Sequence, residues 1–177
     1  MQAVAFLLDA IAGFFCSLFL LRFLMQALRV SFAGQLGDFV VKLTNWAVKP
    51  LRRVIPGLGG MDWASVIAAL GIQLALGLAL FALGGASAIY DGPQLAGMLL
   101  WFAVRNLLRI TIYIVIGALI LQAVMSWINP YSPLAAPVNQ LTRPILAPFR
   151  RFIPPISGID LSPLAVILLL QVLLMLL

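Results

Sequence analysis

The sequence predicts an all-α membrane protein with about four transmembrane helices in two parallel repeats. Two observations support this fold class. Hydrophobic residues make up 64% of the 177 residues and charged residues only 9%, and the mean hydropathy of +1.14 is far above that of soluble chains. In addition, nearly the same basic, proline-rich segment occurs twice, as KPLRRVIPGLGGMD at residues 49–62 and as APFRRFIPPISGID at residues 147–160.

Four apolar segments are predicted to cross the membrane, because each is about as long as the hydrocarbon core is thick. The first two cover residues 3–28 and 63–83. The third covers residues 110–128, with a start nearer Leu95 as the alternative, and the fourth covers residues 161–177.

The two basic segments define an internal repeat. The identical positions share one offset of 98 without a gap and are Pro50/Pro148, Arg52/Arg150, Arg53/Arg151, Ile55/Ile153, Pro56/Pro154, Gly60/Gly158 and Asp62/Asp160. Upstream, Gln26 corresponds to Gln122. Residues 1–83 therefore form the first repeat, 84–94 a linker loop and 95–177 the second repeat. Because each repeat holds an even number of spans, both enter the membrane from the same side.

The distribution of basic residues predicts the orientation in the membrane. Eight of the 11 Lys and Arg residues lie in the two repeated loops, whereas Arg105 and Arg109 lie on the opposite side. The repeated loops are therefore predicted to be cytoplasmic and both termini to be outside. Within the first span, Arg22 is expected to snorkel to the cytoplasmic face. Asp9 either reaches water at the outer end or pairs with Arg105 or Arg109.

Each basic segment is predicted to form an amphipathic helix at the membrane interface, over residues 38–56 and 142–154. Such a helix places its apolar face at the headgroup boundary and its cations beside anionic headgroups. The candidate lipid-binding or partner-binding residues are Arg52, Arg53, Arg150, Arg151, Arg143 and Lys49. The alternative is that these residues only set the topology.

Prolines and glycines in these segments are assigned structural roles. Pro50 and Pro148 are expected to bend or break the interfacial helices, because proline lacks an amide hydrogen. Pro56, Pro154 and Gly158 are expected to turn the chain back towards the bilayer.

Two further recurring pairs of residues are assigned structural roles. Asp62 and Asp160 precede the second span of each repeat and are expected to cap its first amides. Gln73 and Gln171 lie near the middle of these spans, where an amide needs a partner. We expect interhelical hydrogen bonds there, with a solute pathway as the alternative.

The composition argues against an enzyme. The chain lacks Glu and His, and its five acidic residues are all Asp, so the usual general acids, bases and metal ligands are scarce. The single cysteine, Cys16, lies in an apolar run and is interpreted as a buried small hydrophobic residue. No cofactor, metal or nucleic-acid partner is expected.

The second copy of the motif, LTRPILAPFRRFIPPISGIDLSPLAVILLLQVLL at residues 141–174, resembles the YggT family of bacterial membrane proteins, which is related to the YlmG proteins. The resemblance covers essentially the whole chain, and the first copy departs from the pattern at Leu51, Gly57 and Ala64-Ser65. The resemblance implies a multi-pass protein of the bacterial plasma (inner) membrane without catalysis. It also implies a link to osmotic stress and ion homeostasis, or to membrane organisation.

Two functions from different classes remain open. One is a non-enzymatic scaffold or assembly factor that binds anionic lipid, or a membrane or cytoplasmic protein. The other is a small channel or transporter that contributes to osmotic or ion homeostasis. The scaffold is favoured because the polar groups deep in the spans are mainly glutamines, whereas an ion pathway usually holds ionisable or coordinating groups.

Overall fold

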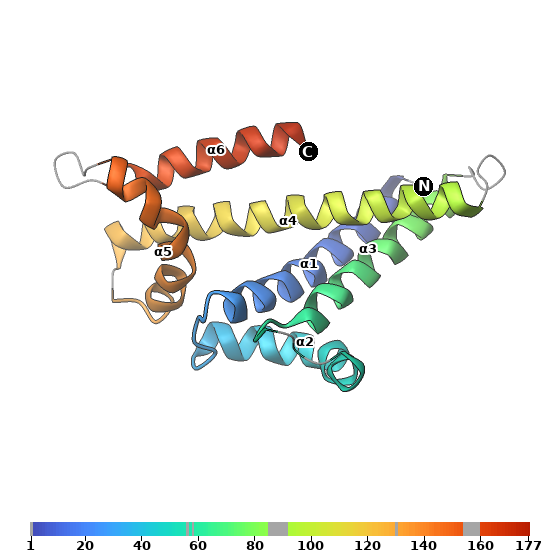
Figure 1. Cartoon of the computed structure of the whole chain (residues 1–177), viewed down its shortest axis with the longest axis horizontal. Coiled ribbons are helices and arrows are strands. Elements are labelled where there is room, and N and C mark those ends of the chain that lie inside the picture. Colours follow the sequence, from blue (N-terminus) through green and yellow to red (C-terminus); the bar gives the residue numbers. More distant parts are fainter. Residues whose placement is uncertain (1, 56, 58, 85–91, 130, 154–159) are drawn as a thin grey trace.

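The computed structural model describes residues 2–55, 57, 59–84, 92–129, 131–153 and 160–177, and all its regular structure over these residues is helical (Figure 1). In chain order the helices are α1 (Gln2–Ala27), α2 (Gln35–Val54), α3 (Trp63–Leu83), α4 (Gly92–Ile128), α5 (Ala135–Phe152) and α6 (Ser162–Leu176). The predicted all-α class is therefore confirmed for the described residues. Pro56, Pro154 and Gly158 lie outside them.

Three helices, α1, α3 and α4, are long and apolar enough to cross a membrane. The first two match the predicted spans within one residue at each end. At 15 residues, α6 would extend only about 23 Å, which is less than the hydrocarbon thickness of about 30 Å. A fourth full span therefore stays a prediction.

The helix that contains the third predicted span extends beyond that span. With 37 residues, α4 begins at Gly92, which is closer to the alternative start near Leu95 than to Ile110. At about 55 Å, α4 is longer than the hydrocarbon core, so its bounds are not those of the span. The linker predicted over residues 84–94 consequently ends too late, since Gly92 and Pro93 belong to the helix. Proline suits the first turn, where its missing N–H has no intrahelical partner to lose.

The helices α2 and α5 bury equivalent faces. Gly37, Val40, Thr44 and Val48 are buried on α2, and the residues 98 positions later, Ala135, Val138, Thr142 and Leu146, are buried on α5. The start of α5 lies seven residues before the predicted one, so the predicted range 142–154 is wrong at its beginning. Both helices therefore reuse one packing pattern, as the sequence repeat implies.

Prolines do not interrupt these two helices. Pro50 lies inside α2, and both Pro144 and Pro148 lie inside α5. Instead of breaking, α2 changes direction near its C-terminal end (Figure 1). A bend is the expected response where proline removes one helical hydrogen bond and its ring crowds the preceding turn.

A tight turn ends α1. The amide of Val30 donates to the Met25 carbonyl at 2.7 Å and the amide of Arg29 to the Gln26 carbonyl at 3.1 Å. This is the Schellman pattern, and Arg29 has the left-handed φ of 55° that the pattern requires. Val30 and Met25 also belong to one apolar cluster, which is the hydrophobic contact that commonly accompanies this turn.

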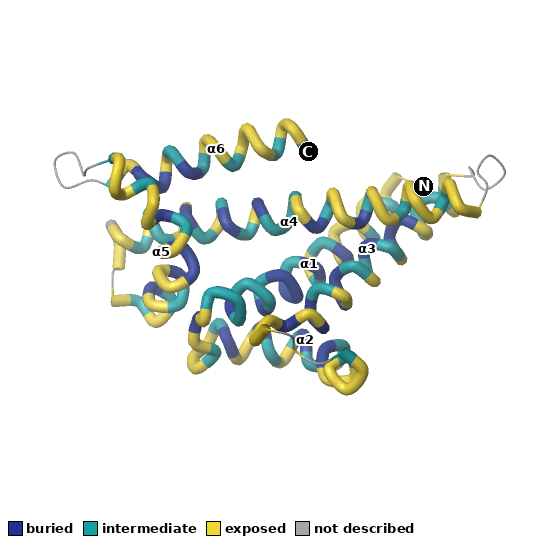
Figure 2. The backbone as a smooth tube through the Cα atoms, viewed as in Figure 1, coloured by how far each residue is buried: buried dark blue, intermediate teal, exposed yellow. Residues whose placement is uncertain are grey.

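The two halves share a core. Leu107 of α4 joins the cluster formed by α1, α2 and α3, and Leu141 of α5 joins the cluster that contains Val40 of α2. The amide of Ser31 also donates to Gln140 Oε1 of α5 at 3.1 Å. These contacts hold α2 and α5 at the same end of the bundle. Burial is concentrated around them, whereas much of α6 is exposed (Figure 2).

Candidate functional site

The centre of the candidate site is Asp62, which directly precedes α3. Its carboxylate, only 1% exposed, lies 2.8 Å from Arg52 Nη2 and 3.1 Å from Arg22 Nε. Arg52 Nε also donates to Asp62 Oδ1 at 3.2 Å, and the Ser65 hydroxyl donates to Oδ2 at 2.8 Å. One buried carboxylate thus joins a cation from α1 and a cation from α2 to the beginning of α3.

Arg22 completes this junction. Its Nη1 donates to Thr44 Oγ1 at 2.7 Å and to Asn45 Oδ1 at 3.0 Å, both on α2. The side chain is 7% exposed. Arg22 was expected to snorkel to water, but it meets Asp62 and α2 instead, because these groups satisfy the guanidinium within the protein.

The two arginines keep Asp62 ionised. Burial by itself raises the pKa of the carboxyl group. Hydrogen bonds from Arg52 and Ser65, together with the charges of Arg52 and Arg22, outweigh this effect and hold the pKa below its ordinary value. The site therefore contains a carboxylate and two guanidinium groups, which leaves a net positive charge.

In the second half the corresponding ion pair has no second cation among the described residues. Arg150 Nε lies 2.8 Å from Asp160 Oδ2, with the two side chains 43% and 35% exposed. The residue that corresponds to Arg22 at the Gln26/Gln122 offset is Ala118, so no second cation comes from α4. The second copy is therefore a more exposed and simpler version of the first.

The capping role predicted for the two aspartates holds for one of them. Asp160 Oδ1 accepts a hydrogen bond from the amide of Ser162, the first residue of α6, at 2.9 Å. This bond and Arg150 keep the pKa of Asp160 below its ordinary value, although partial burial acts in the opposite direction. Asp62 makes no side-chain capping bond to α3. That prediction was wrong because arginines and Ser65 occupy its oxygens.

The two arginines of each Arg-Arg pair have different roles. The first arginine of each pair, Arg52 or Arg150, binds an aspartate. The second, Arg53 or Arg151, is exposed, and within the described ranges it makes no ion pair. Lys49 and Arg143 are exposed as well, and each is likewise unpaired where the structure is described.

Gln73 forms an interhelical contact, as expected for a buried amide. It is fully buried, accepts a hydrogen bond from Asn106 Nδ2 at 2.8 Å and donates to Cys16 Sγ at 3.4 Å. Asn106 was missed because the predicted third span began after it. Gln171, by contrast, is exposed on α6.

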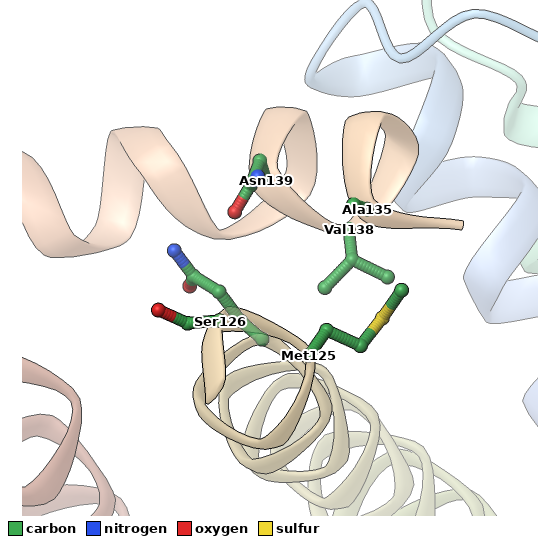
Figure 3. A pocket seen from close by; sticks show the side chains of 6 residues that line it. Met125, Ser126, Ala135, Val138 and Asn139 are labelled. Atoms are coloured by element: carbon green, nitrogen blue, oxygen red, sulfur yellow. The ribbon is translucent and has the colours of Figure 1, made fainter. Parts of the chain in front are cut away.

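A small cavity of about 130 Å³ lies between the end of α4 and the beginning of α5 (Figure 3). Gln122, Ser126 and Asn139 supply its polar lining, and it is large enough for several water molecules. Gln122 Oε1 is buried there with no partner among the described atoms, whereas Gln26, its counterpart, bonds Gly60 and Arg52.

Comparisons with known proteins show the family of the chain. The family model described as CCB3/YggT matches residues 1–83 and 101–177, which together cover most of both halves. The chain belongs to the CCB3/YggT family. The gap in the match falls on the linker and the N-terminal part of α4.

Two curated relatives match nearly the whole chain, and a third matches about half of it. An uncharacterized protein of Pseudomonas aeruginosa is 35% identical over 92% of this chain and 81% of its own length. Uncharacterized protein YggT of Escherichia coli is 34% identical over 97% of this chain and 87% of its own length. A chloroplastic YlmG homolog of Arabidopsis thaliana is 36% identical over 49% of this chain and 34% of its own length. No solved structure matches the chain.

Proposed function

We propose that this CCB3/YggT family member is a non-enzymatic scaffold of the bacterial inner membrane that binds anionic lipid headgroups through α2 and α5. The observation that carries the proposal is the division of each Arg-Arg pair. One arginine binds the aspartate before the next helix, while Arg53 or Arg151 stays exposed. The ion pairs fix the direction of each helix, and the second arginines supply the cations for binding.

The packing supports a joint surface. Contacts between Leu141 and the cluster of Val40, and between Gln140 and Ser31, hold α2 and α5 at one end of the bundle. Two cationic sites on one rigid molecule bind a continuous anionic leaflet more tightly than either site alone. We place this end at the cytoplasmic leaflet, where anionic lipids and the positive-inside rule both favour it.

A channel or transporter is the alternative function. Among the deep polar groups, Gln73 hydrogen-bonds to both Asn106 and Cys16. Such a contact supports a role in holding α1, α3 and α4 together, because polar side chains often join membrane helices in this way. The scaffold is therefore the better supported of the two.

Lipid binding tests the proposal directly. Native mass spectrometry in non-ionic detergent would measure retention of phosphatidylglycerol, with phosphatidylcholine as the uncharged reference. We expect Arg53→Gln or Arg151→Gln to weaken phosphatidylglycerol binding roughly fivefold each, since a basic residue contributes about 1 kcal/mol at an anionic surface. The double variant should lose more than tenfold, and added salt should weaken the parent in the same direction.

Arg105→Gln is the matched control, because Arg105 is exposed on α4, away from α2 and α5. It should bind phosphatidylglycerol like the parent. If the double variant Arg53→Gln/Arg151→Gln also binds like the parent, the exposed arginines serve only to set the topology and the scaffold proposal fails.

A further inference from the structure

The exposed face of α6 is apolar except for one polar residue. Gln171 is exposed there, and Leu164, Leu168 and Met175 around it are 57%, 55% and 85% exposed. Among the described residues no group hydrogen-bonds its amide. Within hydrocarbon an unsatisfied amide is unfavourable, so this face is better suited to another helix than to lipid.

The first repeat shows which kind of helix covers such a face. There α3, the counterpart of α6, packs against both α1 and α4. Phe102 of α4 lies against α3 at Gly77, since a Cβ on that glycine would be 3.2 Å from the Phe102 ring. One turn further, Asn106 donates to Gln73 at 2.8 Å. The C-terminal half of α3 thus contacts a phenylalanine and an asparagine of the other repeat.

Both sides of that contact have counterparts in the chain. At the offset of 98, Gly77 and Gln73 of α3 correspond to Met175 and Gln171 of α6. At the offset of 96 that relates Gln26 to Gln122, the two α4 residues correspond to positions on α1, namely Phe6 for Phe102 and Ala10 for Asn106.

These counterparts do not contact each other within one molecule. Phe6 is 71% exposed and Met175 85% exposed, and Ala10 and Gln171 are exposed as well. Each molecule therefore exposes, on α6 and α1, the counterparts of the two surfaces that form the α3–α4 contact between its repeats. Asp9, one residue before Ala10, is also exposed and offers a carboxylate acceptor for an amide.

We propose that α6 of one molecule packs against α1 of a second copy of the chain, with Met175 beside Phe6 and Gln171 beside Ala10. This contact repeats the α3–α4 contact between molecules. A two-fold axis along the membrane normal would form it twice, which gives a closed dimer. The inference is independent of lipid binding by α2 and α5.

Disulfide crosslinking between two differently tagged copies tests the contact. Cys16 is the only cysteine, so both copies carry Cys16→Ser. One copy then carries Phe6→Cys and the other Met175→Cys, and the two are co-expressed and oxidised in membranes. We expect a disulfide-linked product that contains both tags. No such product, or a disulfide formed only within one chain when both cysteines are on it, would overturn the proposal.

Two controls separate a specific contact from random collision. Ile11 is 57% exposed but lies about 140° around the helix from Phe6, at about 100° per residue. Ile11→Cys should therefore give little product with Met175→Cys. Adding Gln171→Leu to the Met175→Cys copy should lower the crosslinked fraction several-fold. Equal crosslinking by the Phe6 and Ile11 positions would contradict the assigned face.

Discussion

Replacing Asp62 by asparagine is expected to destabilise the protein by about 3 to 5 kcal/mol, because the change leaves the buried cation of Arg22 without its counter-ion. Arg22 has a 7% exposed side chain and Asp62 a 1% exposed one, so water can compensate little for the lost pair. The same change at Asp160 should cost at most about 1 kcal/mol, since a surface ion pair contributes little. Both members of that pair are more than one-third exposed.

Reversible unfolding of the purified protein in mixed micelles would measure both changes in the free energy of unfolding. Asp160→Asn is the matched control, because it removes the corresponding carboxylate of the repeat. Adding Arg22→Leu to Asp62→Asn should recover part of the loss, since the uncompensated cation is then absent. Equal effects of the two Asp→Asn changes would contradict the difference that we infer between the halves.

Gly37→Ala is expected to destabilise the protein by about 1 to 3 kcal/mol, the usual cost of forcing extra atoms into a packed site. A Cβ on Gly37 would clash with the backbone carbonyl of Phe32. A backbone atom cannot move away as a flexible side chain can. The α1–α2 turn would therefore have to shift, and with it the position of α2 below α1 and α3.

The corresponding residue of the second half supplies the control for this prediction. Ala135 occupies the equivalent place on α5, beside the cavity at the end of α4. Ala135→Gly should cost no more than about 1 kcal/mol, the usual helix penalty of glycine. Unfolding in the same mixed micelles measures both variants. A Gly37→Ala protein as stable as the parent would show that the turn tolerates a side chain.

Hydropathy was sufficient to predict α1 and α3, because each is a nearly continuous apolar run of the right length. It was insufficient for α4, where Arg105, Asn106 and Arg109 interrupt the run and made the helix look shorter than it is. For α5, the predicted range began at the repeated basic segment, whereas the helix starts seven residues earlier. In this earlier part Ala135 and Val138 are buried beside the end of α4.

The internal repeat predicted which residues would recur, but not what they would contact. Arg52 and Asp62 were assigned separate roles, as a lipid-binding cation and a helix cap. The structure joins them, because the turn before α3 brings Asp62 back to α2. Arg22 had no repeated counterpart to mark it, so its part in the ion-pair junction could be found only from the folded arrangement.

The central claim is that α2 and α5 lie together at the cytoplasmic face of the membrane, and cysteine accessibility tests it most directly. Val54 and Phe152, at the ends of α2 and α5, are 80% and 85% exposed, and each would be replaced by cysteine in a Cys16→Ser background. Gln2→Cys, at the exposed beginning of α1, marks the opposite side. In spheroplasts a membrane-impermeant maleimide should label Gln2→Cys and leave Val54→Cys and Phe152→Cys unlabelled, with the reverse result in inside-out vesicles. Labelling of Val54→Cys or Phe152→Cys in intact spheroplasts, with protection of Gln2→Cys, would contradict the claim.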